Sequence, residues 1–248
     1  GNSMETAARF FDHAQKKLQQ VLEHEMPNIQ TAADFVTESC AQGGKFYVFG
    51  SGHSHMIAEE LYLRAGGLCL VHGILPPELM LHEMPNKSTY LERVEGYAKA
   101  MVELYHIEEK DTLMVISNSG RNCAIIDAAL EAKKRGAITV AITSMNHTPS
   151  VTSRHSTGLN LSQVCDYVLD NGGIVGDASV ELEGLEQKIA PTSSVIDITL
   201  VNLVLVNTVE LLLQKGMTPP VFTSANTDQG DSANKNILET YKPKIPSL

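Results

Sequence analysis

Five short apolar runs alternate with helical stretches along this chain, and that alternation restricts the possible fold more than any other feature. The runs are bounded by Gly, Ser or Asp and cover residues 45–50, 68–73, 111–117, 137–143 and 165–170. Apolar residues at helical spacing separate most of them, over residues 54–65, 89–104 and 122–135. Short buried strands that alternate with helices are typical of a doubly wound α/β fold around a parallel sheet.

The segments on either side of this core are expected to differ from it. Residues 1–44 carry apolar side chains three and four positions apart, and Pro27 is expected to open a second helix among them. A long apolar helix is expected over residues 193–213. The chain then turns polar, so residues 217–248 are expected to form an extended arm or a flexible tail. Because no repeat or linker interrupts residues 45–216, we expect one domain.

The charge and the cysteines restrict the partners and the cellular setting. The 248 residues carry a formal net charge of −10, which argues against a nucleic acid or an anionic membrane, because both require a basic surface. A small phosphorylated ligand requires only a local pocket. The four cysteines form no CxxC pair, and no apolar run reaches the roughly 18 residues of a membrane span. We therefore expect buried thiols, no membrane partner and a cytoplasmic protein.

The stretch FGSGHSHMIAEEL, residues 49–61, places a glycine- and serine-rich turn between a strand and a helix. Such a turn can direct backbone N–H groups at an anion, although a tight turn with a serine N-cap has the same composition. A dinucleotide fingerprint requires Gly or Ala where His55 stands, and a P-loop requires Gly-Lys-Ser/Thr, which is missing. The turn therefore fits a single phosphate, and no dinucleotide cofactor is expected.

A second loop of the same kind, VISNSGRN at residues 115–122, also follows a buried run and precedes a helix. Ligands of open α/β sheets bind at the carboxyl ends of the strands, where neighbouring loops diverge. If the two strands are neighbours, both serine loops face one pocket, and Thr143-Ser144 at a third strand end points the same way. Hydroxyl and amide groups can hold a phosphate without a net positive charge, which suits an acidic protein.

With these motifs the chain resembles the SIS (sugar isomerase) phosphosugar-binding domain. The resemblance covers residues 45–214 and rests on GSGHS, SNSG, ITS and the segment APTSS (190–194) before the last long helix. GSGHSHMIAEEL and LMLHE are similar to the phosphoheptose-isomerase-like group of that family. The resemblance implies a three-layer sandwich with a five-stranded sheet, and a homodimer or homotetramer with sites near the subunit interface. It implies phosphate contacts at Ser51, Gly52, Ser54, Ser117, Asn118, Ser119, Thr143 and Ser144.

The resemblance does not extend to the zinc site of the phosphoheptose isomerases. Phosphoheptose isomerases hold zinc through a His and a Glu on the helix after the first loop, and through Gln and His late in the chain. Here Met56 stands at the position of the helix His, Glu60 remains, and no histidine follows His155. We therefore expect no metal and no other cofactor. The related etherases carry a catalytic Glu where this chain has Arg64.

Four side chains are candidates for acid–base chemistry on a sugar. Aldose–ketose isomerisation requires a base beside the carbonyl and a group that opens the ring, and Glu, Asp or His suits both roles. Glu59, Glu60 and His55 follow the first loop, and His82 lies in the long segment 73–88, which is typical of a lid. Each of the four can also have a purely structural role. Glu59 and Glu60 can be a core-edge and a solvated side chain, His55 can be solvated, and His82 can lie at the surface or in a dimer contact. Arg121 either reaches an anionic group or is a solvated residue at a helix start.

Three classes of function stay open for this chain. The leading one is an isomerase that acts on a phosphorylated sugar or amino sugar through an ene-diol. The second is a non-catalytic sugar-phosphate sensor, and an etherase or lyase on a phosphorylated amino sugar is a further enzymatic alternative. The third is a structural oligomer with a vestigial site. Binding with or without turnover separates the first two.

Overall fold

The computed structural model describes residues 4–174, 177–224 and 226–244, and its core is one parallel sheet. Within these residues the sheet has five strands in the order β2-β1-β3-β4-β5, all pairs being parallel. They are β1 (Phe46–Gly50), β2 (Val71–Ile74), β3 (Thr112–Ile116), β4 (Ile138–Thr143) and β5 (Tyr167–Asp170). The prediction of a doubly wound α/β fold with five parallel strands is confirmed.

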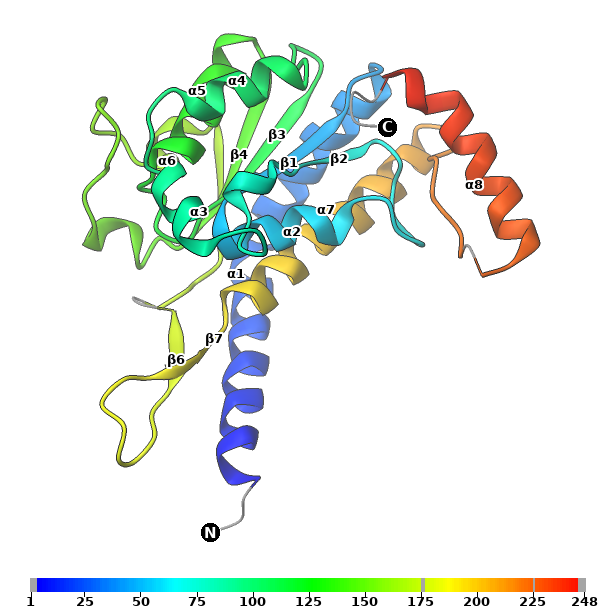
Figure 1. The fold of residues 1–248 in the computed structure, drawn as a ribbon. Helices are drawn as coiled ribbons and strands as arrows, with labels where there is room; N and C mark the ends of the chain where they lie inside the picture. Colours follow the sequence, from blue (N-terminus) through cyan, green and yellow to red (C-terminus); the bar gives the residue numbers. More distant parts are fainter. Residues whose placement is uncertain (1–3, 175–176, 225, 245–248) are drawn as a thin grey trace.

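Helices cover both faces of the sheet (Figure 1). On one face lie α1 (Glu5–Ala41), α2 (His55–Leu61) and α7 (Ser193–Gln214), and on the other α4 (Tyr97–Leu104), α5 (Cys123–Lys134) and α6 (Leu161–Val164). Alternate residues of each strand point to opposite faces. Accordingly Phe46 and Val48 join the core under α1 and α7, while Tyr47 and Phe49 join the core under α4 and α5. Each such buried side chain contributes about 1.5–3 kcal/mol.

The strand order places the two serine loops next to each other. The chain leaves β1 toward β2 on one side and later returns to β3 on the other side, so β1 and β3 are direct neighbours. The loops that follow them start at the same edge of the sheet, because Gly50 pairs with Ile116 at the last position of the register. This edge is the topological switch point at which open α/β sheets bind their ligands.

The prediction of two N-terminal helices is wrong, because α1 runs without interruption from Glu5 to Ala41 and contains Pro27. A proline inside a helix costs about 3 kcal/mol. A buried stripe on α1 outweighs this cost, since its apolar residues pack against α7 and the sheet on both sides of the proline. The stripe comprises Val21, Ile29, Ala32, Ala33 and Val36.

The helix predicted over residues 89–104 is two helices, α3 (Pro85–Leu91) and α4 (Tyr97–Leu104). The break holds Gly96 at φ 97°, a left-handed conformation that favours glycine. Two tertiary hydrogen bonds fix the break to α5: Gly96 N donates to Asp127 Oδ2 at 2.6 Å, and Ala124 N donates to the Glu92 carbonyl at 2.9 Å. The segment 92–96 therefore leaves the helical path and passes the start of α5.

The polar C-terminal segment is helical as well, which corrects the expected extended arm or flexible tail. It contains α8 (Asp228–Tyr241) and a short 3-10 helix, η4 (Lys242–Lys244). The Thr227 side chain caps α8 by accepting a hydrogen bond from Gly230 N at 2.9 Å. Ile237, Leu238 and Tyr241 pack against the buried pair Cys69 and Phe222. Non-local apolar contacts therefore stabilise a helix that the polar composition alone does not predict.

A two-stranded antiparallel hairpin, β6 (Ala178–Val180) with β7 (Ile189–Pro191), precedes α7 and was not predicted. Together with the N-terminal half of α1 it projects away from the body of the molecule (Figure 1). Arg9 on α1 donates to the Glu181 carbonyl in the hairpin at 3.2 Å. We call this projecting part the stalk. It consists of the first half of α1 and the β6–β7 hairpin.

The long apolar helix predicted near residues 193–213 is α7, and its length changes one expectation. By length and composition alone, this helix could cross a membrane, which corrects the statement that no such run exists. In the structure it packs against α1 and α2, and 44% of its most apolar window is buried. The core helix of a globular protein has the same composition, so this observation is weak evidence for a membrane span.

Candidate functional site

The first serine loop is a 3-10 turn, η1 (Gly52–Ser54), that links β1 to α2. Ser54 N donates to the Ser51 carbonyl at 3.1 Å and closes the turn. The turn requires Gly50, because a Cβ at that position would lie 2.7 Å from the Ser54 carbonyl oxygen. The Ser54 side chain is half-buried, and its hydroxyl forms no hydrogen bond within the described part of the chain. This hydroxyl is therefore available to a ligand at the edge of the sheet.

The second serine loop, residues 117–120, is fixed to β3 and β4. Ser117 Oγ accepts a hydrogen bond from Gly120 N at 3.0 Å, and Ser117 N donates to the Ile142 carbonyl. Gly120 has φ 65°, and a Cβ there would meet Leu161 and Thr143 at 3.3 Å. Ser119 is half-buried and its hydroxyl, like that of Ser54, has no partner among the described residues. The two loops thus present a hydroxyl each at the same edge.

Thr143 and Ser144, the third part of the predicted phosphate set, lie fully buried. Thr143 Oγ1 donates to the Asn118 carbonyl at 3.2 Å, and Ser144 Oγ donates to the Gly173 carbonyl at 2.6 Å. Ser144 N also donates to the Asn118 carbonyl at 3.1 Å. The Thr143 hydroxyl and the Ser144 N–H thus hold the second serine loop in place from the core, whereas the Ser144 hydroxyl binds the segment after β5.

A buried carboxyl group supports the same loop through two amides. Asn171, after β5, donates through Nδ2 to Asn118 Oδ1 and to Asp197 Oδ1, both at 3.0 Å. Asp197 lies on the first turns of α7 and is 2% exposed. Burial, only partly offset by the Asn171 hydrogen bond, raises the pKa of Asp197 to about 7. The predicted residue Asn118 is thereby tied to the core on the far side of the loop.

Glu92, which sequence reasoning missed, contacts the first serine loop and the start of α5. Ser51 Oγ donates to Glu92 Oε2 at 2.7 Å, and the Glu92 carbonyl accepts from Ala124 N directly after the second loop. Burial raises the pKa of the Glu92 carboxyl, while the Ser51 hydrogen bond and the charges of Arg93 and Arg154 act against that rise. In a continuous helix over 89–104, Glu92 would be one more surface residue. Gly96 was the available signal that the helix breaks.

The four predicted acid–base side chains occupy different environments. His55 is buried, with its Nδ1 hydrogen-bonded to the Gly52 carbonyl and its Nε2 3.7 Å from Glu59 Oε1. Glu59 is half exposed, and Glu60 forms an ion pair with Arg64 at 2.6 Å. His82 is exposed on the segment between η2 (Pro77–Leu79) and α3. The structure brings His55 and Glu59 together beside the first loop, whereas Glu60 lines a hollow with residues of α7.

The described residues do not fit the zinc site of the phosphoheptose isomerases. Across residues 4–174, 177–224 and 226–244, no three His, Cys, Asp or Glu side chains converge in a way that could hold a metal ion. Met56 occupies the position on α2 where those enzymes place a histidine, and it packs against the hydrophobic core. A catalytic zinc normally has three protein ligands, so we derive no step through a metal.

Comparison with known proteins shows the family of this chain. A family model, the SIS domain, matches residues 9–144. A UPF0309 protein of Halalkalibacterium halodurans is 49% identical over 233 residues, covering 94% of this chain and 95% of the relative. A UPF0309 protein of Listeria monocytogenes serotype 4b is 37% identical over 96% of this chain and 97% of the relative.

Solved structures share the fold at low sequence identity. The phosphoheptose isomerase GmhA of Neisseria gonorrhoeae matches with a TM-score of 0.57 at 16% identity, over 84% of this chain and 98% of that chain. The NanR protein of Vibrio vulnificus, solved with ManNAc-6P, matches with a TM-score of 0.51 at 17% identity, over 98% of this chain and 71% of that chain. The resemblance inferred from the serine loops is therefore confirmed, and the chain belongs to the SIS domain family and, within it, to the UPF0309 proteins.

Proposed function

We propose that this protein binds a phosphorylated sugar at the two serine loops and isomerises it between aldose and ketose. The observation that carries the proposal is the hydrogen bond from Ser51, on the first loop, to the half-buried carboxylate of Glu92. It joins an anion-binding loop to a group that can act as a base. Membership of the SIS family supports the sugar-phosphate ligand, as do a phosphoheptose isomerase and a ManNAc-6P complex among proteins of the same fold.

The phosphate is proposed to lie between the two loops. The hydroxyls of Ser54 and Ser119 and the N–H groups of both loops supply donors, and the start of α5 adds the positive end of a helix dipole. Ser51, Gly52, Ser117 and Asn118 shape the loops, and Thr143 and Ser144 support them from the core. No metal or other cofactor takes part in this proposal.

Glu92 is proposed as the base. Its carboxylate removes a proton from the carbon next to the carbonyl, which leaves an ene-diolate, and returns the proton to the neighbouring carbon. A carboxyl whose pKa is raised by burial suits both steps. Its carboxylate has a higher proton affinity than that of a solvated Glu, so it accepts the proton more readily and can still release it. His55 or His82 is proposed to assist ring opening, and Glu59 and Glu60 are the alternative bases predicted from the sequence.

A sugar-phosphate sensor is the second candidate. The structural match to NanR, which was solved with ManNAc-6P, covers nearly all of this chain and favours it. One experiment separates the two: a panel of sugar phosphates is screened by thermal shift, and each ligand found is incubated with the protein and followed by NMR. New sugar signals support the isomerase. Binding without any new signal supports the sensor and contradicts the isomerase.

The serine loops lead to a prediction for binding. We expect Ser54→Ala and Ser119→Ala each to weaken the sugar phosphate by roughly 1–3 kcal/mol, since each removes a hydrogen bond to a charged group. Calorimetry measures the dissociation constants, with Ser232→Ala on the exposed face of α8 as the matched control. The unphosphorylated sugar should bind poorly to all four proteins. Equal affinity for the phosphorylated and unphosphorylated sugar would contradict the phosphate site.

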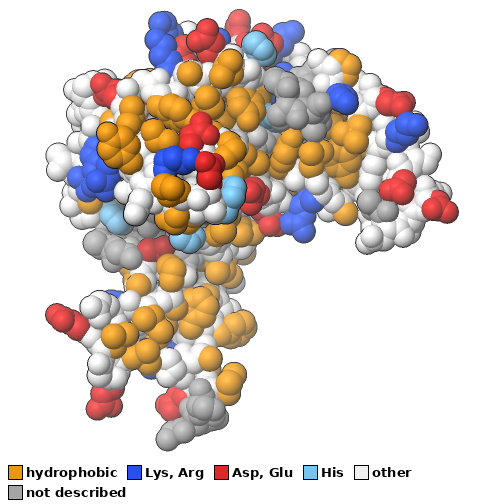
Figure 2. All heavy atoms as spheres, in the orientation of Figure 1, with side chains coloured by type: hydrophobic (Ala, Val, Ile, Leu, Met, Phe, Trp, Pro, Cys, Tyr) orange, Lys and Arg blue, Asp and Glu red, His pale blue; other side chains and the backbone are white. Residues whose placement is uncertain are grey.

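We also propose a homodimer or homotetramer, formed through the stalk. Figure 2 shows hydrophobic side chains over the projecting part of the molecule, and Phe11, Leu185 and Ile189 there are 67%, 45% and 41% exposed. Exposed apolar patches on a narrow projection indicate a protein interface. We expect light scattering at micromolar concentration to show a dimer or larger, and Phe11→Glu to shift it to smaller species. Leu104→Glu, at a 63% exposed leucine on α4, is the control.

Two further proposals concern the domain organisation of the chain and its cellular compartment. Residues 1–44, 45–216 and 217–248 are proposed to form one domain, because α1 and α8 both pack on the core that lies between them in sequence. A cytoplasmic setting is proposed because all four cysteines are buried and free.

A further inference from the structure

Three arginines lie together beside the second serine loop. Arg121 directly follows Gly120, and the backbone N–H of Arg154 donates to the Arg121 carbonyl at 2.8 Å. Burial and then the charges of Arg121 and Arg93 lower the pKa of Arg154, so Arg154 lies close enough to both of them to be repelled. Arg93 follows Glu92 in the break between α3 and α4. The cluster therefore adjoins both the second loop and the proposed base.

This positive charge is poorly compensated. None of the three arginines forms an ion pair with any residue that the structure describes, whereas Arg64 and Arg135 pair with Glu60 and Glu131. The carboxylate that acts electrostatically on Arg154 is the half-buried Glu92, which is hydrogen-bonded to Ser51. Three arginines beside one carboxylate leave a local excess of positive charge in a chain whose net charge is −10. Bringing like charges together costs free energy, and a bound anion removes that cost.

The two arginines nearest the loop are held in place but keep donors free. Arg121 donates through Nε to the Thr152 carbonyl at 2.9 Å, and Arg154 donates through Nη1 to Asn122 Oδ1 at 2.8 Å. A guanidinium has five N–H donors arranged for two-point contact with carboxylate or phosphate. The contacts within the described chain use one nitrogen of each side chain, so the remaining donors are available to an anion.

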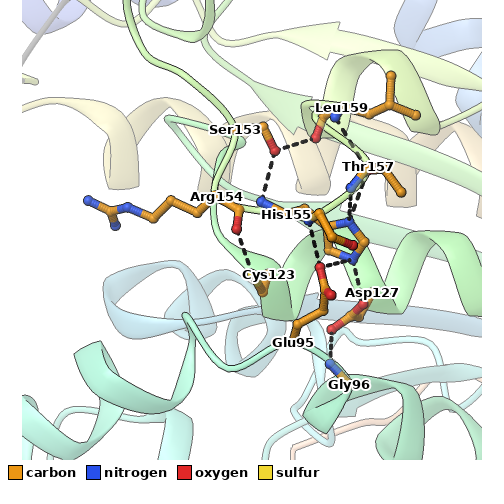
Figure 3. A network of polar contacts seen from close by, with 10 residues as sticks. Glu95, Gly96, Cys123, Asp127, Ser153, Arg154, His155, Thr157 and Leu159 are labelled. Carbon is orange, nitrogen blue, oxygen red and sulfur yellow. Dashed lines mark hydrogen bonds and ion pairs between the residues drawn. The ribbon is translucent and has the colours of Figure 1, made fainter.

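A network below Arg154 fixes the loop that carries it (Figure 3). His155, 8% exposed, donates through Nε2 to Asp127 Oδ1 on α5 at 2.8 Å and lies 3.2 Å from Glu95 Oε1. Cys123 Sγ donates to the Arg154 carbonyl at 3.2 Å. The side chain of Arg154 extends away from this network. The loop after β4 is thus fastened to α5, and Arg154 is positioned before any ligand arrives.

We propose that Arg121 and Arg154, with Arg93 beside them, bind a second anionic group of the ligand, a carboxylate or a second phosphate. The serine loops then hold one phosphate and the arginines hold the other charge, so the ligand class is a sugar phosphate with two anionic groups. This inference rests on the proposed function, because it places the second group relative to the phosphate at the serine loops.

Two pairs of compounds with matched skeletons test the proposal by calorimetry. They are glucose 6-phosphate against 6-phosphogluconate, and fructose 6-phosphate against fructose 1,6-bisphosphate. We expect the member with two anionic groups, in at least one pair, to bind about tenfold or more tightly than the member with one, which is the gain that one charged hydrogen-bonded contact supplies. Arg154→Gln and Arg121→Gln should remove that preference while affinity for the monophosphate changes little. Arg135→Gln, at the other end of α5, should keep it.

The outcomes separate this inference from the proposed function. Monophosphates that bind as well as their partners with two anionic groups, with no selective effect of Arg121→Gln or Arg154→Gln, overturn the second anion site and leave the phosphate site standing. If both arginine variants lose the monophosphate as well, the arginines bind the first phosphate and the inference is wrong. If none of these four compounds binds the wild type, the inference fails, whereas the proposed function fails only if no sugar phosphate of the wider panel binds either. Thermal unfolding of each variant checks that it is folded, and Gln replaces the charged guanidinium by a shorter, uncharged polar side chain.

Discussion

Replacement of Glu92 by glutamine is expected to lower isomerase turnover about a thousandfold, within the range that general acid–base catalysis supplies. The amide has nearly the same shape and can still accept the hydrogen bond from Ser51 Oγ, so the first serine loop should keep its structure. It cannot take a proton from carbon. Ligand affinity should therefore change little while kcat collapses.

The measurement is the kcat and KM of wild type and variant with the sugar phosphate that the panel identifies. Glu103→Gln, at an exposed glutamate on α4, is the matched control and should retain wild-type turnover. Burial raises the pKa of Glu92, so the acid limb of the wild-type profile should lie above the value of about 4.3 for a solvated Glu. A larger loss in Glu59→Gln or Glu60→Gln than in Glu92→Gln would assign the base to α2 and contradict this proposal.

Replacement of Asp197 by asparagine is expected to stabilise the protein above pH 7 and to leave its stability nearly unchanged near pH 4. Burial raises the pKa of Asp197 from 3.8 to about 7. Between these values the folded protein holds a proton that the unfolded chain has released, so the free energy of unfolding falls as pH rises through this window. A shift of this size corresponds to a penalty of at most about 4 kcal/mol, complete above pH 7.

Asparagine avoids that penalty because it carries no charge, and its Oδ1 can still accept the hydrogen bond from Asn171 Nδ2. Urea unfolding of wild type and Asp197→Asn from pH 4 to pH 8 measures the difference, with the exposed Asp34→Asn on α1 as control. The two curves should diverge as pH rises, and the control should run parallel to wild type. Parallel curves for Asp197→Asn as well would show that the carboxyl is ionised at low pH in the folded protein.

Much of the architecture follows from local sequence alone. The five strands appear where short apolar runs end in Gly, Ser or Asp, because strands covered by helices on both faces are rich in apolar side chains. Phe46 to Phe49 are all buried, two under each layer of helices. The serine loops could be located in the same way, since a strand that stops at the edge of a parallel sheet must turn into a helix there. Gly50 marks the first turn because a side chain has no room there, and Gly120 marks the second because its φ of 65° favours glycine.

Tertiary contacts decided the remaining features, because the residues that stabilise them are far apart in sequence. Pro27 stays inside α1 since burial against α7 and the sheet exceeds the cost of one lost hydrogen bond. Glu92 reaches the site only because Asp127 and Ala124 on α5 hold the break between α3 and α4. Arg154, 33 positions beyond Arg121, joins the same edge because the loop after β4 folds back over α5. Local spacing predicts where elements form, whereas the shape of the site depends on which distant side chains become buried together.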